Sequence, residues 1–156
     1  MVQITIEYMI LTPVLILLIF LLPFTAHEAM DGYVSSRQNL EIQKVAGHLG
    51  SGLQQVYFSL IHDTVAAGTI YSDTQVPPLI EGYEYNINCT SRLALDSGAT
   101  IVDISIKLSG SGTTASTSVT LGKNVEWSDS FFRSDSTTAT IVATKLDGQI
   151  QMSINP

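Results

Sequence analysis

The stretch YMILTPVLILLIFLLPFTA, residues 8–26, decides how this chain of 156 residues is organised. It contains no charged residue and is about as long as a helix that crosses the hydrocarbon core of a bilayer, roughly 20 residues. Only 13% of the whole chain is charged, which is low for a soluble protein. We therefore expect this segment to spend part of the protein's life in an apolar phase.

The rest of the chain is polar, mildly acidic and rich in Ser, Thr and Gly, with a formal net charge of −7 overall. Its seven Lys and Arg residues are scattered, so no basic patch favours nucleic acid as a partner. The single cysteine, Cys89, has no partner for an intrachain disulfide, and its expected role is that of a small buried hydrophobe. His27, His48 and His62 are too far apart for a local metal motif, and no nucleophile elbow is present. We expect no cofactor and no enzymatic activity.

The N-terminus does not read as an ordinary secretory signal, because an acidic residue, Glu7, precedes the apolar run and the first basic residue is Arg37. The same lack of flanking cations leaves the orientation of the span undetermined. The simplest expectation is that a basic leader has been removed or that the chain begins close to its mature start.

Apolar residues recur at steps of three and four beyond the apolar run, from Met30 to Ile61, which predicts that the helix continues as an amphipathic one. One helix from about residue 4 to about residue 66 would be roughly 90 Å long. Pro13 and Pro23 are the expected kink points.

Segments rich in β-branched residues follow, separated by clusters of Gly, Asp and Ser. They predict an antiparallel sheet of about five strands that packs on the C-terminal half of the amphipathic helix. The expected strands are residues 83–89, 101–108, 115–121, 138–144 and 149–154, with Asp147-Gly148 as a hairpin turn.

The predicted fold class is therefore α+β, a lollipop with a long helical stem and a β head. We expect residues 1–27 to form an apolar transmembrane or filament-core helix, residues 28–67 its amphipathic continuation and residues 68–156 the head. The first segment is apolar on all faces, so in water it needs a cover of lipid or of copies of itself.

The residues around the start of the apolar run form a recognisable motif. Gln3, Thr5, Glu7 and Leu11 resemble the Gln-x-Ser-x-Glu-x-x-x-Leu motif at the mature start of archaeal type IV pilins, with Thr in place of Ser. The class III signal peptides of that family are removed before the glutamine and end in basic residues and Gly. Only Met1-Val2 precede Gln3 here, so either a leader lies upstream or processing is unusual.

The resemblance implies a pilin, the structural subunit of an extracellular filament that serves adhesion or surface attachment. It implies a membrane-inserted precursor, a prepilin peptidase, an assembly ATPase with its platform, and self-association into a helical homopolymer. Contacts in the filament core are then expected from Ile10, Leu11, Val14, Leu15, Leu17, Leu18, Phe20 and Leu21.

Family resemblance also offers a role for Glu7, as an acid that pairs with the terminal amine of a neighbouring subunit and sets register during assembly. An unpaired carboxylate in an apolar bundle costs several kcal/mol, so such a pairing is physically reasonable. The alternative is an acid that rests at the membrane interface.

Asn88-Cys89-Thr90 is the one N-glycosylation sequon in the sequence, and its alternative reading is a strand end. The Ser/Thr-rich stretches around residues 109–120 and 128–140 suit O-glycans or simply exposed strand faces. Two further functions stay open: a membrane-anchored single-pass protein with an external β domain, and a minor pilin or pseudopilin of a secretion or uptake machine.

Overall fold

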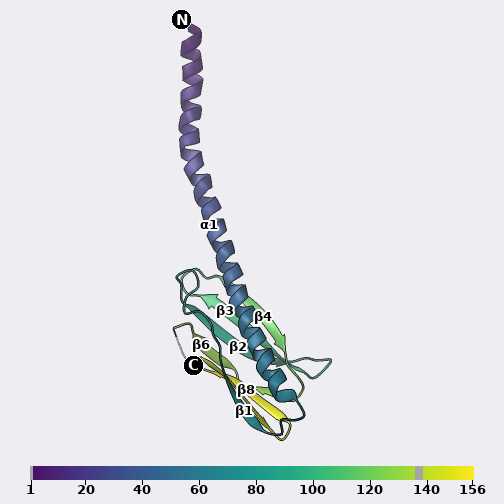
Figure 1. Ribbon diagram of the computed structural model, residues 1–156. Helices are drawn as coiled ribbons and strands as arrows, with labels where there is room; N and C mark the ends of the chain where they lie inside the picture. The colour runs from purple at the N-terminus through teal and green to yellow at the C-terminus, as the bar shows by residue number, and fades with distance from the viewer. Residues whose placement is uncertain (1, 136–138) are drawn as a thin grey trace. The chain divides into compact units, whose positions relative to one another are not determined.

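The computed structural model describes the backbone of residues 2–135 and 139–156, and the side chains of residues 9–135 and 139–156. One long helix is followed by a domain of mainly antiparallel strands, so the predicted α+β class is confirmed (Figure 1). The elements are α1 (Val2–Ile61), β1 (Gly68–Asp73), β2 (Tyr85–Leu93), β3 (Thr100–Leu108), β4 (Thr114–Thr120), β5 (Val125–Trp127), β6 (Ser130–Arg133), β7 (Thr140–Leu146) and β8 (Gln149–Asn155).

Two compact units divide the chain, Met1–Arg37 and Gln38–Pro156, and we call the second unit the head. The head therefore contains the last part of α1 together with all the described strands. Helix α1 continues through Pro13 and Pro23, and the kinks expected there stay a prediction. It ends at Ile61 rather than near residue 66, and the amide of Val65 then donates to the carbonyl of His62 in a turn.

The strands form two four-stranded sheets, ordered β1-β7-β8-β5 and β4-β3-β2-β6. The expected single sheet of about five strands was wrong. The five predicted strands correspond to β2, β3, β4, β7 and β8, whereas β1, β5 and β6 were missed. Strands β5 and β6 are too short to show a clear alternation of apolar and polar residues, and β5 pairs with β8 in parallel.

The hairpin between β7 and β8 turns at Asp147-Gly148, as predicted. Both residues have positive φ, 49° and 81°, which is what the central pair of a type I′ turn requires. This turn fixes the register of β7 against β8 and so decides which side chains face the core.

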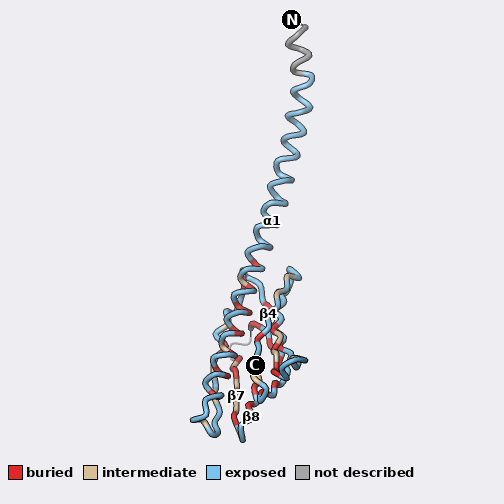
Figure 2. The backbone as a smooth tube through the Cα atoms, turned by 90° about the vertical axis from the view of Figure 1, so that its right-hand side faces the viewer, coloured by how far each residue is buried: buried red, intermediate tan, exposed pale blue. Residues whose placement is uncertain are grey.

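The core of the head lies between the last part of α1 and both sheets, and its buried residues are red in Figure 2. Close approach of helix and sheet depends on Gly50, whereas a Cβ at Gly52 would make only an ordinary van der Waals contact. A Cβ at Gly50 would lie 2.8 Å from Cγ2 of Val119 on β4, and one at Gly52 would lie 3.5 Å from Cδ1 of Ile141 on β7. The helix contributes Ile42, Val45, Ala46, Leu49, Leu53, Val56, Tyr57 and Leu60 to this core.

Each large aliphatic side chain buried there contributes about 1.5–3 kcal/mol by leaving water. Phe132 and Trp127 belong to the core, while the adjacent Phe131 is exposed. Cys89 is fully buried, as predicted, and its burial raises the pKa of the thiol to about 12.

Candidate assembly site

The N-terminal unit offers the clearest functional surface because none of its described side chains is buried. Every residue from Met9 to Arg37 is exposed, and these residues are pale blue along the helix in Figure 2. Met9 to Ala26 carries no charge. This helix is long and apolar enough to cross a membrane.

The predicted filament-core residues all lie on this exposed part of α1. Leu11 of the assembly motif and the seven packing residues are solvent-accessible; they are Ile10, Val14, Leu15, Leu17, Leu18, Phe20 and Leu21. The side chains of Gln3, Thr5 and Glu7 lie outside the described residues, although the backbone at these positions is helical. The role expected for Glu7 therefore stays a prediction.

One face of the helix is hollowed into an open apolar groove. It is lined by Thr12, Pro13, Ile16, Leu17, Phe20, Leu21 and Phe24, which recur at steps of three and four residues along about three turns. A stripe of this kind is the surface that receives the ridge of a second helix. Its two largest side chains, Phe20 and Phe24, are both uncovered, with exposed fractions of 75% and 66%.

Two local polar contacts lie at the end of the apolar run. The hydroxyl of Thr25 donates to the carbonyls of Leu21 and Leu22, each at 3.1 Å, so it needs no water. At the end of the run, Nε2 of His27 lies 3.7 Å from Oδ2 of Asp31 one turn later. The apolar run therefore ends in ionisable groups that suit a polar interface.

Asn88, the predicted glycosylation site, lies on β2 with its side chain exposed. Its neighbours across the sheet are Ser105 on β3 and Phe131 on β6. Thr90, the third sequon residue, is also exposed, because residues two apart in a strand face the same way.

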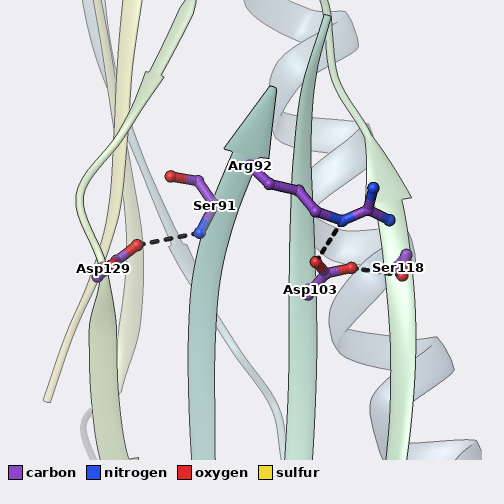
Figure 3. A network of polar contacts seen from close by, with 5 residues as sticks. All are labelled: Ser91, Arg92, Asp103, Ser118 and Asp129. Carbon is purple, nitrogen blue, oxygen red and sulfur yellow. Dashed lines mark hydrogen bonds and ion pairs between the residues drawn. The ribbon is translucent and has the colours of Figure 1, made fainter. Parts of the chain in front are cut away.

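Further along the same outward face, a polar network joins β2, β3 and β4 (Figure 3). Asp103 accepts hydrogen bonds from the Ser118 hydroxyl at 2.5 Å and from Nε of Arg92 at 2.7 Å. The hydrogen bond from Ser118 and then that from Arg92 lower the pKa of Asp103, because both favour the ionised carboxylate. Both of its oxygens are engaged in holding the strands in register.

A second link in this region is made by Asp129, whose Oδ1 accepts from the amide of Ser91 at 3.0 Å (Figure 3). It connects the segment between β5 and β6 to the exposed end of β2. Sequence reasoning missed these contacts because the paired residues are far apart in the chain and only the strand register brings them together.

No protein-family model, curated protein sequence or solved structure matches this chain. Its own residues establish an exposed apolar helix of membrane-spanning length joined to a β head, an arrangement compatible with a pilin-like or a membrane-anchored protein.

Proposed function

We propose that this chain is a pilin, the structural subunit of an extracellular filament of the archaeal type IV pilus kind. The observation that carries the proposal is the contrast between the two units. The head has a hydrophobic core of its own, whereas every helix residue from Met9 to Arg37 is exposed. A bundle of identical helices covers such a surface once it has left the lipid.

Assembly requires no small-molecule chemistry in this proposal. The precursor sits in the membrane through its apolar helix, a prepilin peptidase exposes the mature end before Gln3, and an assembly ATPase with its platform drives polymerisation. The helix then exchanges lipid contacts for contacts with other copies, and the head faces the medium, where it serves attachment. An N-glycan on Asn88 fits an outward position on the head, since that side chain is exposed.

Glu7 distinguishes polymerisation from simple anchoring. In the filament its carboxylate pairs with the terminal amine of a neighbouring copy, and this pairing sets the register of the helices. In a single-pass anchor it rests at the lipid–water interface and has no assembly role.

The test is to shear filaments from cells that make the chain and to compare the yield for Glu7→Ala with that for the wild type. We expect Glu7→Ala to reduce or abolish filaments while the head unfolds at the same denaturant concentration. Ser36→Ala, an exposed polar site on the same helix, serves as the control and should leave the yield unchanged. Normal filament numbers in Glu7→Ala would refute the role in assembly proposed for Glu7.

The membrane-anchored reading is the second candidate, and it is favoured by the same exposed apolar segment. It predicts that the chain is recovered only from the membrane fraction, as a monomer in detergent. A minor pilin or pseudopilin differs from the main proposal in copy number alone, so counting subunits per filament separates those two.

A further inference from the structure

The outward face of the sheet β1-β7-β8-β5 presents two rows of side chains that the proposed assembly does not use. Strand register places Tyr71, Val142 and Ser153 side by side in one row. The second row consists of Thr69, Thr144, Gln151 and Glu126. These side chains point away from the core, because the residues between them, such as Ala143 and Met152, are buried.

A groove of about 360 Å³ follows these rows, which is within the size range of small-ligand sites. Its outward-facing lining residues are Glu126, Ser128, Val142, Thr144, Gln151 and Ser153. Three hydroxyls, an amide and a carboxylate thus converge on one hollow. They supply both donors and acceptors of hydrogen bonds.

Two contacts hold these groups in place before any ligand arrives. Nε2 of Gln151 donates to Oε2 of Glu126 at 3.2 Å, across the parallel pair β5 and β8. The hydroxyls of Thr69 and Thr144 lie 3.1 Å apart across β1 and β7. Because the side chains are already oriented, less conformational entropy is lost when a ligand binds.

The charge of the lining residues disfavours an anionic ligand in the groove. Glu126 is the only ionisable side chain among the lining residues, and they include no Lys or Arg. Lys145 lies on the same strand as Thr144 but points to the opposite side, where its ammonium donates to carbonyls of the helix end. An anionic ligand therefore finds no counter-charge in the groove and meets a carboxylate.

An aromatic side chain borders the groove. Tyr71 on β1 is paired with Val142, which lines the groove, and its exposed fraction is 72%. A tyrosine this exposed to solvent presents an apolar ring face together with a polar hydroxyl. Sugar rings combine the same features, with C–H groups on their faces and hydroxyls around their edges.

We propose that this groove is a binding site for a neutral glycan, with Tyr71 as the stacking platform and Gln151 and Glu126 as hydrogen-bonding partners of the sugar hydroxyls. The site lies on the head alone, so it does not depend on filament assembly. The outward face of the other sheet is different in charge, because it carries Arg92, Lys107 and Arg133 together with Asp103, which pairs with Arg92.

The test is titration calorimetry with the full chain in neutral detergent. The probes are three neutral hexasaccharides, of β-1,4-linked glucose, of β-1,4-linked mannose and of N-acetylglucosamine, together with the anionic hexamer of galacturonate. We expect at least one neutral hexamer to bind and hexagalacturonate to show no heat of binding. Tyr71→Ala and Gln151→Ala should each weaken that binding about tenfold or more, the effect of losing one good contact.

Phe131→Ala is the matched control, since Phe131 is also an exposed aromatic on an edge strand but lies on the other sheet. It should leave glycan affinity unchanged, and all variants should unfold at the wild-type temperature. Failure of all three neutral hexamers to bind at millimolar concentration overturns the proposal, as does equal loss of affinity in Phe131→Ala.

Filament yield, measured on the same variants, separates this proposal from the assembly proposal. Normal filaments from a chain that binds no neutral hexamer refute the glycan site and leave the pilin function standing. Glycan binding by a chain that forms no filaments does the reverse. A fall in filament yield for Tyr71→Ala without any glycan binding identifies the groove as a contact between copies and refutes the glycan site.

Discussion

The ammonium of Lys145 lies buried at the end of α1, with an exposed fraction of only 9%. Its Nζ donates to the carbonyl of Leu60 at 2.8 Å and to that of His62 at 3.2 Å. The last carbonyls of a helix lack partners within the helix and carry partial negative charge, so a cation there both satisfies them and complements the helix dipole. This residue therefore links β7 to the point where the helix ends.

We expect Lys145→Met to destabilise the head by about 1–3 kcal/mol, because it removes the side-chain donor to the buried carbonyl of Leu60 and one of the two donors to the carbonyl of His62. Urea unfolding of the full chain in detergent, followed by the fluorescence of the single tryptophan, Trp127, measures the change. Lys107→Met on the exposed face of β3 is the control and should change stability by less than about 0.5 kcal/mol. Equal effects of the two substitutions would refute the capping role.

Two buried acids, the Cys89 thiol and the Tyr85 hydroxyl, make the folded state less stable at high pH. Burial raises the pKa of Cys89 from 9.0 to about 12 and that of Tyr85 from 10.0 to about 12. Between pH 9 and 12 the unfolded chain loses these protons while the folded chain keeps them, so the folded state binds more protons and stability falls as pH rises. Each group contributes a slope of up to about 1.4 kcal/mol per pH unit.

We expect Cys89→Ala to flatten the fall in unfolding free energy between pH 9 and 10, the range in which the thiol of the unfolded chain ionises before the tyrosine does. Urea unfolding at a series of pH values measures this slope for the variant and the wild type. An unchanged slope of unfolding free energy against pH would show that Cys89 does not cause the fall in this pH range. Below pH 8 both proteins should show no dependence from this source, because the thiol is protonated in both states.

Residue roles differed in how far the sequence could predict them. The burial of Cys89 followed from its lack of any partner, and the exposure of Ile10 to Leu21 followed from an apolar run with nothing in the sequence to cover it. The role of Lys145 could not be predicted, since a lysine in an alternating strand reads as solvent-exposed until the helix end is placed beside it.

At the scale of elements, two glycines on α1 test how the helix meets the sheets. Gly47 is exposed, and a Cβ there would meet nothing within 4 Å, whereas Gly50 is buried and a Cβ there would lie 2.8 Å from Cγ2 of Val119. Replacing Gly by Ala in a helix interior stabilises the helix by about 1 kcal/mol through its higher helix propensity, and this term applies at both positions. Overpacking against stiff, β-branched Val119 costs about 1–3 kcal/mol at Gly50 alone.

We therefore expect Gly47→Ala to stabilise the head by about 1 kcal/mol and Gly50→Ala to bring no gain or a loss. The comparison is made by urea unfolding of the two variants in the same detergent. Equal stabilisation by both substitutions would mean that the helix does not approach β4 as closely as described.

Element predictions succeeded where a periodic pattern was long enough. The helix and five of the described strands were predicted from their periods, and the turn at Asp147-Gly148 from its residue types. Strands β5 and β6 were missed because three or four residues carry too little alternation, and β1 because its outer residues include the exposed Tyr71. The division into two sheets depends on pairing between distant segments, which local patterns do not encode.

At the scale of the whole molecule, the two units are expected to respond independently to substitution. None of the residues that form the core of the head comes from the N-terminal unit. We expect Leu17→Lys to abolish filaments, because a cation in an apolar bundle is costly, while the head unfolds at the wild-type urea concentration. Leu17→Met conserves volume and polarity, and it should retain filaments.

Loss of head stability in Leu17→Lys would contradict this independence. Retention of filaments would instead place Leu17 outside the subunit contacts. Both quantities are measured on one preparation, by pelleting sheared filaments and by unfolding the detergent-solubilised chain.

The sequence predicted the order of stem and head because a long uncharged run needs an apolar cover and the alternating segments follow it. It could not predict the groove on the sheet β1-β7-β8-β5, because two of the four strands that carry its rows were not recognised from the sequence. The groove thus became visible only once the strand register was known.

Copies of this chain are proposed to polymerise through the exposed apolar helix. The most direct measurement is to shear the cell surface, pellet the filaments, reconstruct them by cryo-electron microscopy and identify the subunit by its peptides. The account predicts a core in which helices from many copies of this chain pack together, with the groove of Phe20 and Phe24 covered by a neighbouring helix. Recovery of the chain only as a monomer from membranes, and its absence from every filament, would contradict the account.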